Sequence, residues 1–315
     1  MTSCPEGAAI DRGYRTVWQH PGRRCNWLKD AAISRFIKRR FTEMKTVVIT
    51  GAGGVLCSCF AKALAADGCG VALLDINGEA VEELASEIGR SGGVARAYKA
   101  NVLDREMLEG VRELVHKDLG RCDVLINGAG GNNPRATTAH EVYEPGDETR
   151  DDVKTFFNLG KNDFNFVFDL NIVGVMIPTQ VFAQDMIPGG GSIVNISSMN
   201  AIRPLTKIPA YSSAKAGVSN LTKWLAVHFA GTGIRANAIL PGFFVTNQNR
   251  ALLYAEDGTP TPRTDKILAA TPMKRFGEPE ELLGALRFLI DDKASGFITG
   301  VELPVDGGFA AYSGV

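Results

Sequence analysis

Short apolar segments alternate with amphipathic, helix-like segments along most of this chain, and this alternation limits the folds open to it. Residues 46–50 form a β-branched run without a charge, which is typical of a strand buried in a parallel sheet. Residues 78–90 mix apolar and charged side chains at helical spacing. Further strands are expected at 70–75, 95–101, 122–127, 192–197, 234–239 and 301–305, and further helices up to about 67 and over 104–119. Strands that alternate with helices predict an α/β fold, a doubly wound parallel sheet with helices on both faces, built as a single domain.

Composition excludes several classes of protein. The 315 residues carry 34 Lys+Arg against 35 Asp+Glu, and 45% of them are hydrophobic, which are ordinary values for a globular chain. A net charge of −1 argues against a strongly basic nucleic-acid binder, and the apolar content argues against a disordered chain. No apolar run approaches the roughly 18–20 residues that span a bilayer, so no membrane association is expected.

The first 43 residues differ in charge from the rest. They hold nine Lys+Arg and four Asp+Glu, whereas the remaining residues are acidic overall. They also lack the apolar centre of a signal peptide. We expect residues 1–43 to be a basic extension that packs poorly or precedes the native start, because a strand begins directly after Met44; a targeting segment is the alternative. Residues 44–315 are the expected domain.

The six cysteines include no C-x-x-C pair, and with four histidines they show no metal-ligand spacing. We therefore expect no metal site. Reduced thiols and a cytoplasmic location are expected for the same reason.

A glycine-rich turn joins the first strand to its helix. Gly51, Gly53 and Gly54 let backbone N–H groups approach a pyrophosphate at a helix N-terminus, where the helix dipole favours an anion. Asp75 ends the second strand, 24 residues after Gly51. A carboxylate there accepts hydrogen bonds from both hydroxyls of an adenosine ribose and repels a 2′-phosphate. Either feature alone is also found at ordinary turns and helix caps, but together they predict a dinucleotide site that takes NAD in preference to NADP.

Tyr211 and Lys215 lie four residues apart, so in a helix both side chains share one face. A nearby ammonium favours the phenolate, which predicts a tyrosine pKa below its ordinary value of ~10 and a general acid/base for a carbonyl/alcohol pair. Ser197 and Ser198 close the fifth expected strand, at the edge where parallel α/β sheets bind ligands. A hydroxyl there can hold the reacting oxygen, although a helix cap uses a serine in the same way.

These motifs, in order and spacing, resemble the short-chain dehydrogenase/reductase family over essentially residues 44–315. The matching positions are Thr50-Gly51, Asp75, Asn101-Val102, Asn127-Gly128-Ala129-Gly130, Asn171, Ser198, Tyr211 with Lys215, Pro241-Gly242 with Thr246, and Val305-Asp306-Gly307-Gly308. The resemblance implies a Rossmann-like fold, an NAD-dependent oxidoreductase that acts on CH–OH groups, and a homo-oligomer, usually a tetramer.

The resemblance also implies roles for single residues. Tyr211 would exchange the proton, Lys215 would bind the nicotinamide ribose and lower the tyrosine pKa, and Ser198 would polarise the substrate oxygen. Asn171, the fourth member of the implied catalytic tetrad, would hold a water of the proton relay. Cofactor contacts are implied for Gly51, Gly53, Gly54, Val55, Leu56, Asp75, Asn101, Val102, Asn127, Gly128, Ala129, Gly130, Tyr211, Lys215, Pro241, Gly242 and Thr246.

One departure from the family pattern concerns the glycine-rich turn. The family expects glycine at positions 55 and 57, where this chain has Val55 and Cys57. A β-branched Val55 would push a pyrophosphate outward, and Gly53 with Gly54 would move the flexible point earlier. Cys57 is small enough for close helix–strand packing, so a structural role is expected for it.

Polar residues are expected beside the ligand crevice. The candidates for substrate binding are Asn132, Asn133, Arg135, Ser198, Asn200, Arg203, Gln248 and Arg250. Amides suit hydroxyl groups, and guanidinium groups hold a carboxylate through two hydrogen bonds, which predicts a small, polyhydroxylated, acidic substrate. The last two candidates follow Pro241-Gly242, where the family keeps a mobile lid. The stretch between Asn127 and Asn171 is also longer than is usual in the family, and its acidic surplus predicts a surface excursion or a subunit contact.

Several runs, among them G-G-N-N-P-R-A-T-T and P-G-F-F-V-T-N-Q-N-R, resemble the short-chain-type D-mannonate oxidoreductases, also called fructuronate reductases. That resemblance implies D-fructuronate + NADH ⇌ D-mannonate + NAD⁺. The alternatives are a reductase of another sugar acid such as 5-ketogluconate, a dehydrogenase of a neutral sugar, ketose or polyol, and a catalytically idle NAD(H)-binding regulator. A nucleic-acid role for the basic N-terminus is the least expected.

Overall fold

The computed structural model describes residues 44–246 and 250–314. The chain divides into two units, Met1–Glu43 and Met44–Val315, and all of the structure given below belongs to the second. The basic extension expected over residues 1–43 lies outside the described residues, as does Gln248.

Seven parallel strands form the sheet, in the order β3-β2-β1-β4-β5-β6-β7. Their bounds are β1 Thr46–Thr50, β2 Gly70–Asp75, β3 Val94–Lys99, β4 Val124–Asn127, β5 Gly191–Ile196, β6 Ile234–Pro241 and β7 Glu302–Val305. Each strand falls where the sequence predicts one, with ends that differ by one or two residues, and the doubly wound parallel sheet is confirmed. The strand order reverses between β1 and β4, so the carboxyl ends of these strands border the crevice where such sheets bind ligands.

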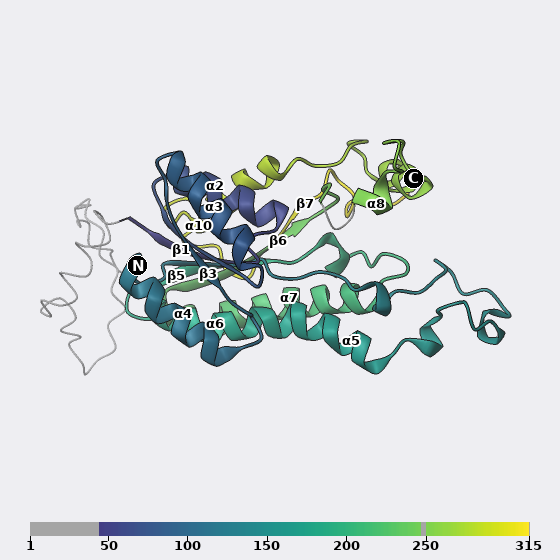
Figure 1. Ribbon diagram of the computed structural model, residues 1–315, viewed down its shortest axis with the longest axis horizontal. Coiled ribbons are helices and arrows are strands. Elements are labelled where there is room, and N and C mark those ends of the chain that lie inside the picture. The colour runs from purple at the N-terminus through teal and green to yellow at the C-terminus, as the bar shows by residue number, and fades with distance from the viewer. Residues whose placement is uncertain (1–43, 247–249, 315) are drawn as a thin grey trace, which may run out of the picture. The chain divides into compact units, whose positions relative to one another are not determined.

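Helices cover both faces of the sheet (Figure 1). One face carries α2 (Val55–Ala66), α3 (Gly78–Arg90) and α10 (Leu283–Ile290), and the other carries α4 (Arg105–Asp118), α6 (Gly174–Met186) and α7 (Pro209–His228). The remaining helices are α5 (Lys161–Phe168), α8 (Arg250–Leu253) and α9 (Pro262–Ala270). Because both faces are covered, β1, β4, β5 and β6 are buried along their whole length.

Each face of the sheet has its own apolar core. Phe60 of α2 and Ile49 of β1 belong to the core on one face. Phe182 of α6 and Leu125 of β4 belong to the core on the other face. The two-residue period of the strands sends alternate side chains into these two cores, which is why the strands read as uninterrupted apolar runs.

The helices α5 and α6 form one continuous helical stretch, Lys161–Met186, with a π-helical turn over Asp169–Val173 between them. Among the described residues it is the one helix long and apolar enough to cross a membrane, and half of its most apolar window is buried inside the protein. Within this stretch, α6 packs on β4 and β5. Its buried Asp185 accepts hydrogen bonds from Arg112 of α4 and pairs with His116 of the same helix as Arg112. Packing in the helical layer therefore accounts for the buried apolar side chains of this stretch.

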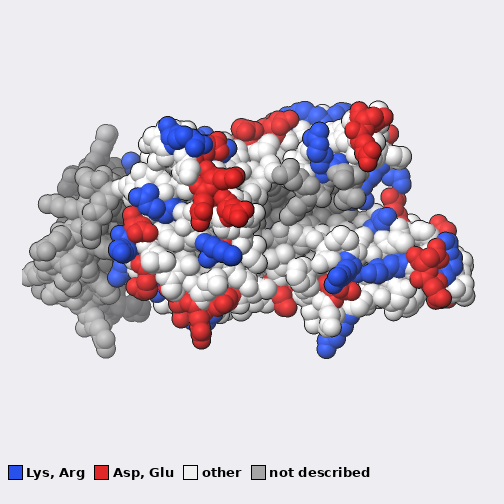
Figure 2. Space-filling model, viewed as in Figure 1, with Lys and Arg blue, Asp and Glu red and all other residues white. Residues whose placement is uncertain are grey.

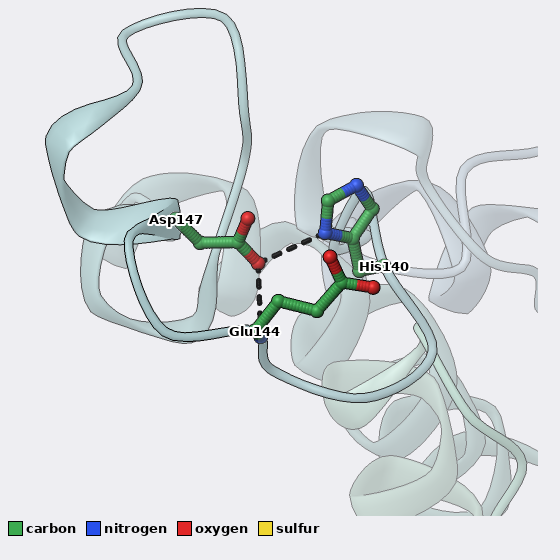
Figure 3. A group of neighbouring side chains, drawn as sticks. All are labelled: His140, Glu144 and Asp147. Atoms are coloured by element: carbon green, nitrogen blue, oxygen red, sulfur yellow. Dashed lines mark hydrogen bonds and ion pairs between the residues drawn. The ribbon is translucent and has the colours of Figure 1, made fainter.

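The segment between β4 and α5 is irregular and holds three 3₁₀ turns, Pro134–Ala136, Asp147–Thr149 and Phe156–Asn158. We call residues 137–160 the insertion. Its interior is organised by the buried carboxylate of Asp147, which lies 2.9 Å from His140 Nδ1 and accepts a hydrogen bond from the Glu144 N–H at 3.2 Å (Figure 3). These three side chains have the spacing of metal ligands, but Asp147 already finds its partners inside the loop. The insertion therefore supplies the hydrogen-bond partners of its own buried carboxylate, Asp147.

Candidate active site

The turn between β1 and α2 lies against the segment that follows β4. Thr50 Oγ1 accepts hydrogen bonds from the N–H groups of Gly128 at 3.1 Å and Ala129 at 3.3 Å. Gly51 has a φ of +66°, and a Cβ on it would lie 2.8 Å from the Ala129 Cα. Only glycine meets both conditions, so Gly51 allows the two strand ends to approach each other.

The N-terminus of α2 is open toward this crevice. Gly54 caps α2 without a side-chain hydrogen bond, which leaves the N–H groups of the first turn for an anion. Asp75 Oδ2 accepts a hydrogen bond from the Gly53 N–H at 3.0 Å, and its Oδ1 accepts one from the Asn77 N–H at 2.9 Å. A Cβ on Gly53 would lie 3.2 Å from Asp75 Oδ2, which is unusually tight. The half-exposed carboxylate beside an open helix end fits the ribose and pyrophosphate of a dinucleotide.

Cys57, where the family has glycine, is buried under this turn. A Cβ on Gly128 would lie only 2.1 Å from Cys57 Sγ, so the absence of a side chain at 128 makes room for the sulfur. Burial raises the pKa of Cys57 to about 12, which keeps the group a neutral thiol. Val55 and Leu56, which begin α2, are half-buried. The sulfur therefore fills the space between helix and strand as expected of a structural residue.

Two other residues implied in cofactor binding, Asn127 and Val102, have buried side chains, and a third, Asn101, makes a local side-chain contact. Asn127 is buried, and its Nδ2 donates to Thr179 Oγ1 at 3.0 Å and to Asn195 Oδ1 at 2.8 Å. Val102 is buried against Gly174, where a Cβ would lie 3.0 Å from Val102 Cγ2. Asn101 Oδ1 accepts a hydrogen bond from the Leu103 N–H. These contacts leave mainly the main-chain groups of Asn127 and Val102 to face a ligand.

The four tetrad residues lie near one another at the carboxyl ends of β4 and β5. A Cβ on Gly130 would lie 2.7 Å from Asn171 Oδ1 and 3.1 Å from Lys215 Nζ. Lys215 Nζ lies 5.7 Å from the centre of the Tyr211 ring. Ser198 lies close enough to Tyr211 to lower its pKa. The geometry thus joins residues from β5, α7 and the π-helical turn into one cluster.

Asn171 reaches this cluster from the π-helical turn and is fully buried. Its Nδ2 donates to the carbonyls of Gly131 and Val167, both at 2.8 Å, and its Oδ1 accepts from the Gly131 N–H at 3.2 Å. The side-chain amide is therefore fully engaged with main chain. A π-helical turn is a frequent feature of functional sites, and nothing in the local sequence signalled it.

Burial changes the acid–base properties of the cluster. It raises the pKa of Tyr211 above its ordinary value of 10, and the hydrogen bond from Ser198 offsets part of that rise. It lowers the pKa of Lys215 to about 8, because desolvation disfavours the ammonium. The expectation of a tyrosine pKa below 10 is thus wrong for this geometry, because the loss of hydration raises that pKa more than Ser198 lowers it.

The segment after β6 begins at Pro241-Gly242, as the resemblance implies. The Gly242 N–H donates to the Val305 carbonyl at 3.0 Å, and a Cβ on Gly242 would lie 2.6 Å from the Asp306 Cα. Thr246, further along, accepts the Arg250 N–H through its carbonyl at 2.9 Å. A cavity of about 380 Å³ lies beside this segment, lined by Phe243, Phe244, Thr271, Met273, Arg275, Gly277, Glu281 and Pro304 to Gly308. That lining includes no tetrad residue.

The candidate substrate residues are only partly brought together. Asn200, in the turn after Ser198, is buried, and its Oδ1 is one of three buried side-chain polar atoms without a hydrogen-bond partner among the described residues. Asn132 donates to Thr137 Oγ1, and Asn133 caps the turn over Pro134–Ala136. Asn200 is therefore the substrate candidate whose buried side-chain oxygen is left to accept a hydrogen bond from a ligand.

The three arginines predicted as carboxylate ligands lie at the surface. Arg135 and Arg203 are exposed, and the Arg250 guanidinium lies over the Tyr254 ring at 5.9 Å. Gln248, the remaining candidate, falls outside the described residues. The structure shows no contact that joins these arginines into one clamp.

A different set of cations lies between the insertion and α9. Lys266 of α9 pairs with Glu141 of the insertion at 2.9 Å, and Lys207 and Arg263 are close enough to lower the pKa of Glu141 as well. Lys207, four residues before Tyr211, has a φ of 73°, and its carbonyl accepts the Thr138 N–H at 2.8 Å. Figure 2 shows Lys and Arg on both sides of the hollow between the lobe with α8 and the lobe with the insertion. Spacing along the chain did not reveal this group, because its members come from three distant segments.

Comparison with known proteins gives matches along most of the chain. A family model described as enoyl-(acyl carrier protein) reductase matches residues 54–310. The chain is 59% identical over 274 residues to an uncharacterized oxidoreductase of Haemophilus influenzae, which covers 87% of this chain and 95% of that protein. It is 51% identical over 272 residues to the uncharacterized oxidoreductase UxuB of Bacillus subtilis, covering 86% of this chain and 96% of that protein.

A solved structure points the same way. A crystal structure of a Haemophilus influenzae protein, provisionally named a D-mannonate oxidoreductase and holding bound NAD, matches with a TM-score of 0.83 at 58% identity. The match covers 87% of this chain and 98% of the other. The order of the strands, the glycine-rich turn and these matches all indicate the same family. The chain belongs to the short-chain dehydrogenase/reductase family of oxidoreductases.

Proposed function

We propose that the chain catalyses D-fructuronate + NADH + H⁺ ⇌ D-mannonate + NAD⁺. The observation that carries the proposal is the meeting of Ser198, Tyr211, Lys215 and Asn171 beside the Gly51–Gly54 turn. It combines an acid/base group with an open helix N-terminus at one edge of the sheet. That combination suits hydride transfer at a carbon that also gains or loses a proton on oxygen.

NAD is the proposed cofactor, and the bound NAD in the Haemophilus influenzae structure supports it. The first turn of α2 would hold the pyrophosphate, and Asp75 would accept hydrogen bonds from the adenosine ribose while repelling a 2′-phosphate. When bound, the nicotinamide supplies or accepts the hydride. Lys215 would meet the nicotinamide ribose, and Thr246 the carboxamide.

Tyr211 is the proposed general acid in reduction and general base in oxidation. Its hydroxyl would deliver the proton to the substrate oxygen, while Ser198, which lies near Tyr211, would hold that same oxygen. The Lys215 side chain is held at the end of β5, because its Nζ donates a hydrogen bond to the Ile196 carbonyl at 2.8 Å. Because the side chain of Asn171 is engaged with Gly131 and Val167, we assign the relay water to its main-chain carbonyl.

The proposed substrate class is a small, polyhydroxylated anion. Support comes from the provisional name of the Haemophilus influenzae relative and from the cations Lys207, Arg263 and Lys266 near the insertion. The unpaired, buried Asn200 Oδ1 would accept a hydrogen bond from a substrate hydroxyl. A steroid or an acyl chain would call instead for an apolar lining.

A substrate panel tests this proposal. NADH absorbance is followed with D-fructuronate, 5-ketogluconate, and neutral ketoses of the same length. We expect kcat/KM to be highest for D-fructuronate and to fall about 10²- to 10⁴-fold in Tyr211→Phe, the usual loss on removing a general acid. Equal rates with neutral ketoses would contradict the anionic substrate, a maximum with 5-ketogluconate would reassign it, and an unaffected Tyr211→Phe variant would contradict the mechanism.

We also propose a cytoplasmic homotetramer. The four cysteines of the described part are free thiols, which agrees with a reducing compartment. On the outer face of α7, Trp224 is 56% exposed and Val227 is 80% exposed, an apolar surface that suits a helix contact between subunits. Light scattering of the purified protein checks the assembly, and Val227→Glu is expected to shift it toward smaller species.

A further inference from the structure

Strand β5 meets helix α7 through two buried polar contacts, one above the other. Asn195 Nδ2 donates to Thr222 Oγ1 at 2.9 Å. Two residues along the strand, Ser197 Oγ lies 3.0 Å from the Lys215 carbonyl and 3.1 Å from Ser219 Oγ. All five residues are more than nine-tenths buried. The two-residue period of the strand and the turn of the helix bring these pairs into register.

The direction of the hydrogen bond to Lys215 follows from its acceptor. The Lys215 carbonyl can only accept, so the Ser197 hydroxyl supplies the proton of that bond. Ser197 Oγ and Ser219 Oγ lie 3.1 Å apart, and either hydroxyl can donate to the other. Glu302 of β7 pairs with Lys223 of the same helix at 2.5 Å, which ties α7 to β7 as well.

Both ends of Lys215 are thereby held by consecutive residues of one strand end. Its carbonyl accepts from Ser197, and its Nζ donates to the carbonyl of Ile196 at 2.8 Å. The next residue, Ser198, lies close enough to Tyr211 to lower its pKa. Tyr211 and Lys215 both belong to α7, so a shift of α7 along β5 would move Tyr211 relative to Ser198 and relative to the Lys215 Nζ, which the Ile196 carbonyl holds.

We infer that Ser197 is a positioning residue, which with Ser219 fixes α7 on β5 and so sets the place of Tyr211 relative to the Lys215 ammonium. The inference rests on the acid/base roles proposed above for Tyr211 and Lys215. The hydroxyl of Ser197 contacts Lys215 and Ser219 of α7, so it acts through the main chain of Lys215. The ion pair between Glu302 and Lys223 holds the same helix on β7.

The test compares Ser197→Ala with Ser197→Thr, which keeps the hydroxyl, and with Thr222→Val, which removes the neighbouring contact from the same helix but has no bond to Lys215. The Tyr211 pKa is read from the near-ultraviolet absorbance of the phenolate, as a difference from the same variant carrying Tyr211→Phe. The pH profile of kcat is measured with D-fructuronate and NADH.

We expect Ser197→Ala to raise the Tyr211 pKa and to move the pH profile by about 0.5 to 1 unit, the size of ordinary environmental shifts. We expect kcat to fall about tenfold with little change in KM, less than the roughly hundredfold that a 1 Å misplacement costs. Ser197→Thr restores both quantities. Ser219→Ala, which removes the contact with Ser197 but keeps the hydrogen bond from Ser197 to the Lys215 carbonyl, gives a smaller shift in the same direction.

Thr222→Val is expected to lose comparable thermal stability while its Tyr211 pKa and pH profile stay at the wild-type values. An equal shift in Thr222→Val would show that loss of stability alone is responsible, and an unshifted Ser197→Ala would overturn the inference. A wild-type protein that does not oxidise NADH would contradict the proposed function instead. The phenolate titration still decides the role of Ser197 in that case, because it needs no substrate.

Discussion

Asp75 illustrates how one side chain supports both a turn and a ligand site. It accepts hydrogen bonds from the N–H groups of Gly53 and Asn77 and remains half-exposed. Its carboxylate therefore holds the glycine-rich turn in shape while keeping lone pairs for two ribose hydroxyls. Lys215 differs from Asp75 because it is buried, and the loss of hydration disfavours its charged form.

Asp75→Ala is expected to weaken NADH use and to admit NADPH. Removing the like charge opposite a 2′-phosphate should raise kcat/KM with NADPH roughly 10- to 100-fold, since such a juxtaposition costs several kcal/mol. Steady-state kinetics with both cofactors measure the change. Asp75→Asn, which keeps an acceptor for the turn, separates lost charge from lost turn support. Unchanged selectivity in both variants would mean that another residue holds the ribose.

The depressed pKa of Lys215 predicts a pH-dependent stability. Its folded pKa of about 8 lies below the ordinary 10.5, so the unfolded chain binds more protons between these values and stability rises with pH across that window. Below about pH 8 the full penalty is present, roughly 3 kcal/mol for the shift. Lys215→Met removes this dependence but leaves the Ile196 carbonyl unpaired, a pH-independent loss. In urea unfolding, the stability of wild type relative to Lys215→Met should therefore rise from pH 8 to pH 10.5; a flat difference would refute the shift.

At the scale of elements, the insertion and α9 act as neighbours although more than a hundred residues separate them. Glu141 and Lys266 form the one ion pair between them among the described residues, and the Thr138 N–H ties the insertion to Lys207 just before α7. The insertion is thus connected both to the helix that carries Tyr211 and to the helical segment after Pro241-Gly242. Its composition predicts a surface excursion or a subunit contact, and these two links place it beside α9 and the start of α7.

Lys266→Glu is expected to raise KM for D-fructuronate, because it breaks the contact that holds the insertion on α9 and places a second acid at the mouth. Because solvent and salt screen an exposed pair, the change should be at most about fivefold and should shrink at high salt. Glu141→Lys combined with Lys266→Glu should recover most of the loss. Arg105→Glu, which breaks an exposed pair on α4, is the control. A double variant no better than Lys266→Glu would exclude the ion pair as the cause.

At the scale of the whole molecule, the sheet, both cores and the site lie within Met44–Val315. The family model matches residues 54–310, inside the same span. The described part already holds the residues that the proposed reaction requires, apart from Gln248. The basic segment before Met44 is therefore not needed to explain the chemistry.

A chain that starts at Met44 is expected to keep kcat and KM within about twofold of the full chain, a difference of roughly 0.4 kcal/mol. The physical reason is that every described member of both apolar cores lies after Met44. NADH oxidation and thermal unfolding of the two proteins measure this. A large loss of activity in a shortened chain that still unfolds cooperatively would assign a functional role to residues 1–43.

Local sequence determined much of this protein. Apolar runs placed the strands, helical spacing placed α3 and α4, and the glycines before α2 with Asp75 marked the nucleotide end, because each of these patterns is written in neighbouring residues. The tetrad was also identified before its geometry, through the spacing of Ser198, Tyr211 and Lys215 and the family resemblance. Such features need no knowledge of which elements pack together.

Tertiary structure alone decided the rest. The inward turn of Asn127, the π-helical turn at Asn171, the raised pKa of Tyr211 and the link from Ser197 to Lys215 all depend on the register between a strand and a helix far apart in the chain. Burial and hydrogen-bond partners are set by that packing, and a desolvated phenol beside an equally desolvated ammonium titrates differently from the same pair on an isolated helix. The spacing of residues along the chain identifies the candidates, whereas tertiary packing sets their protonation and their hydrogen-bond partners.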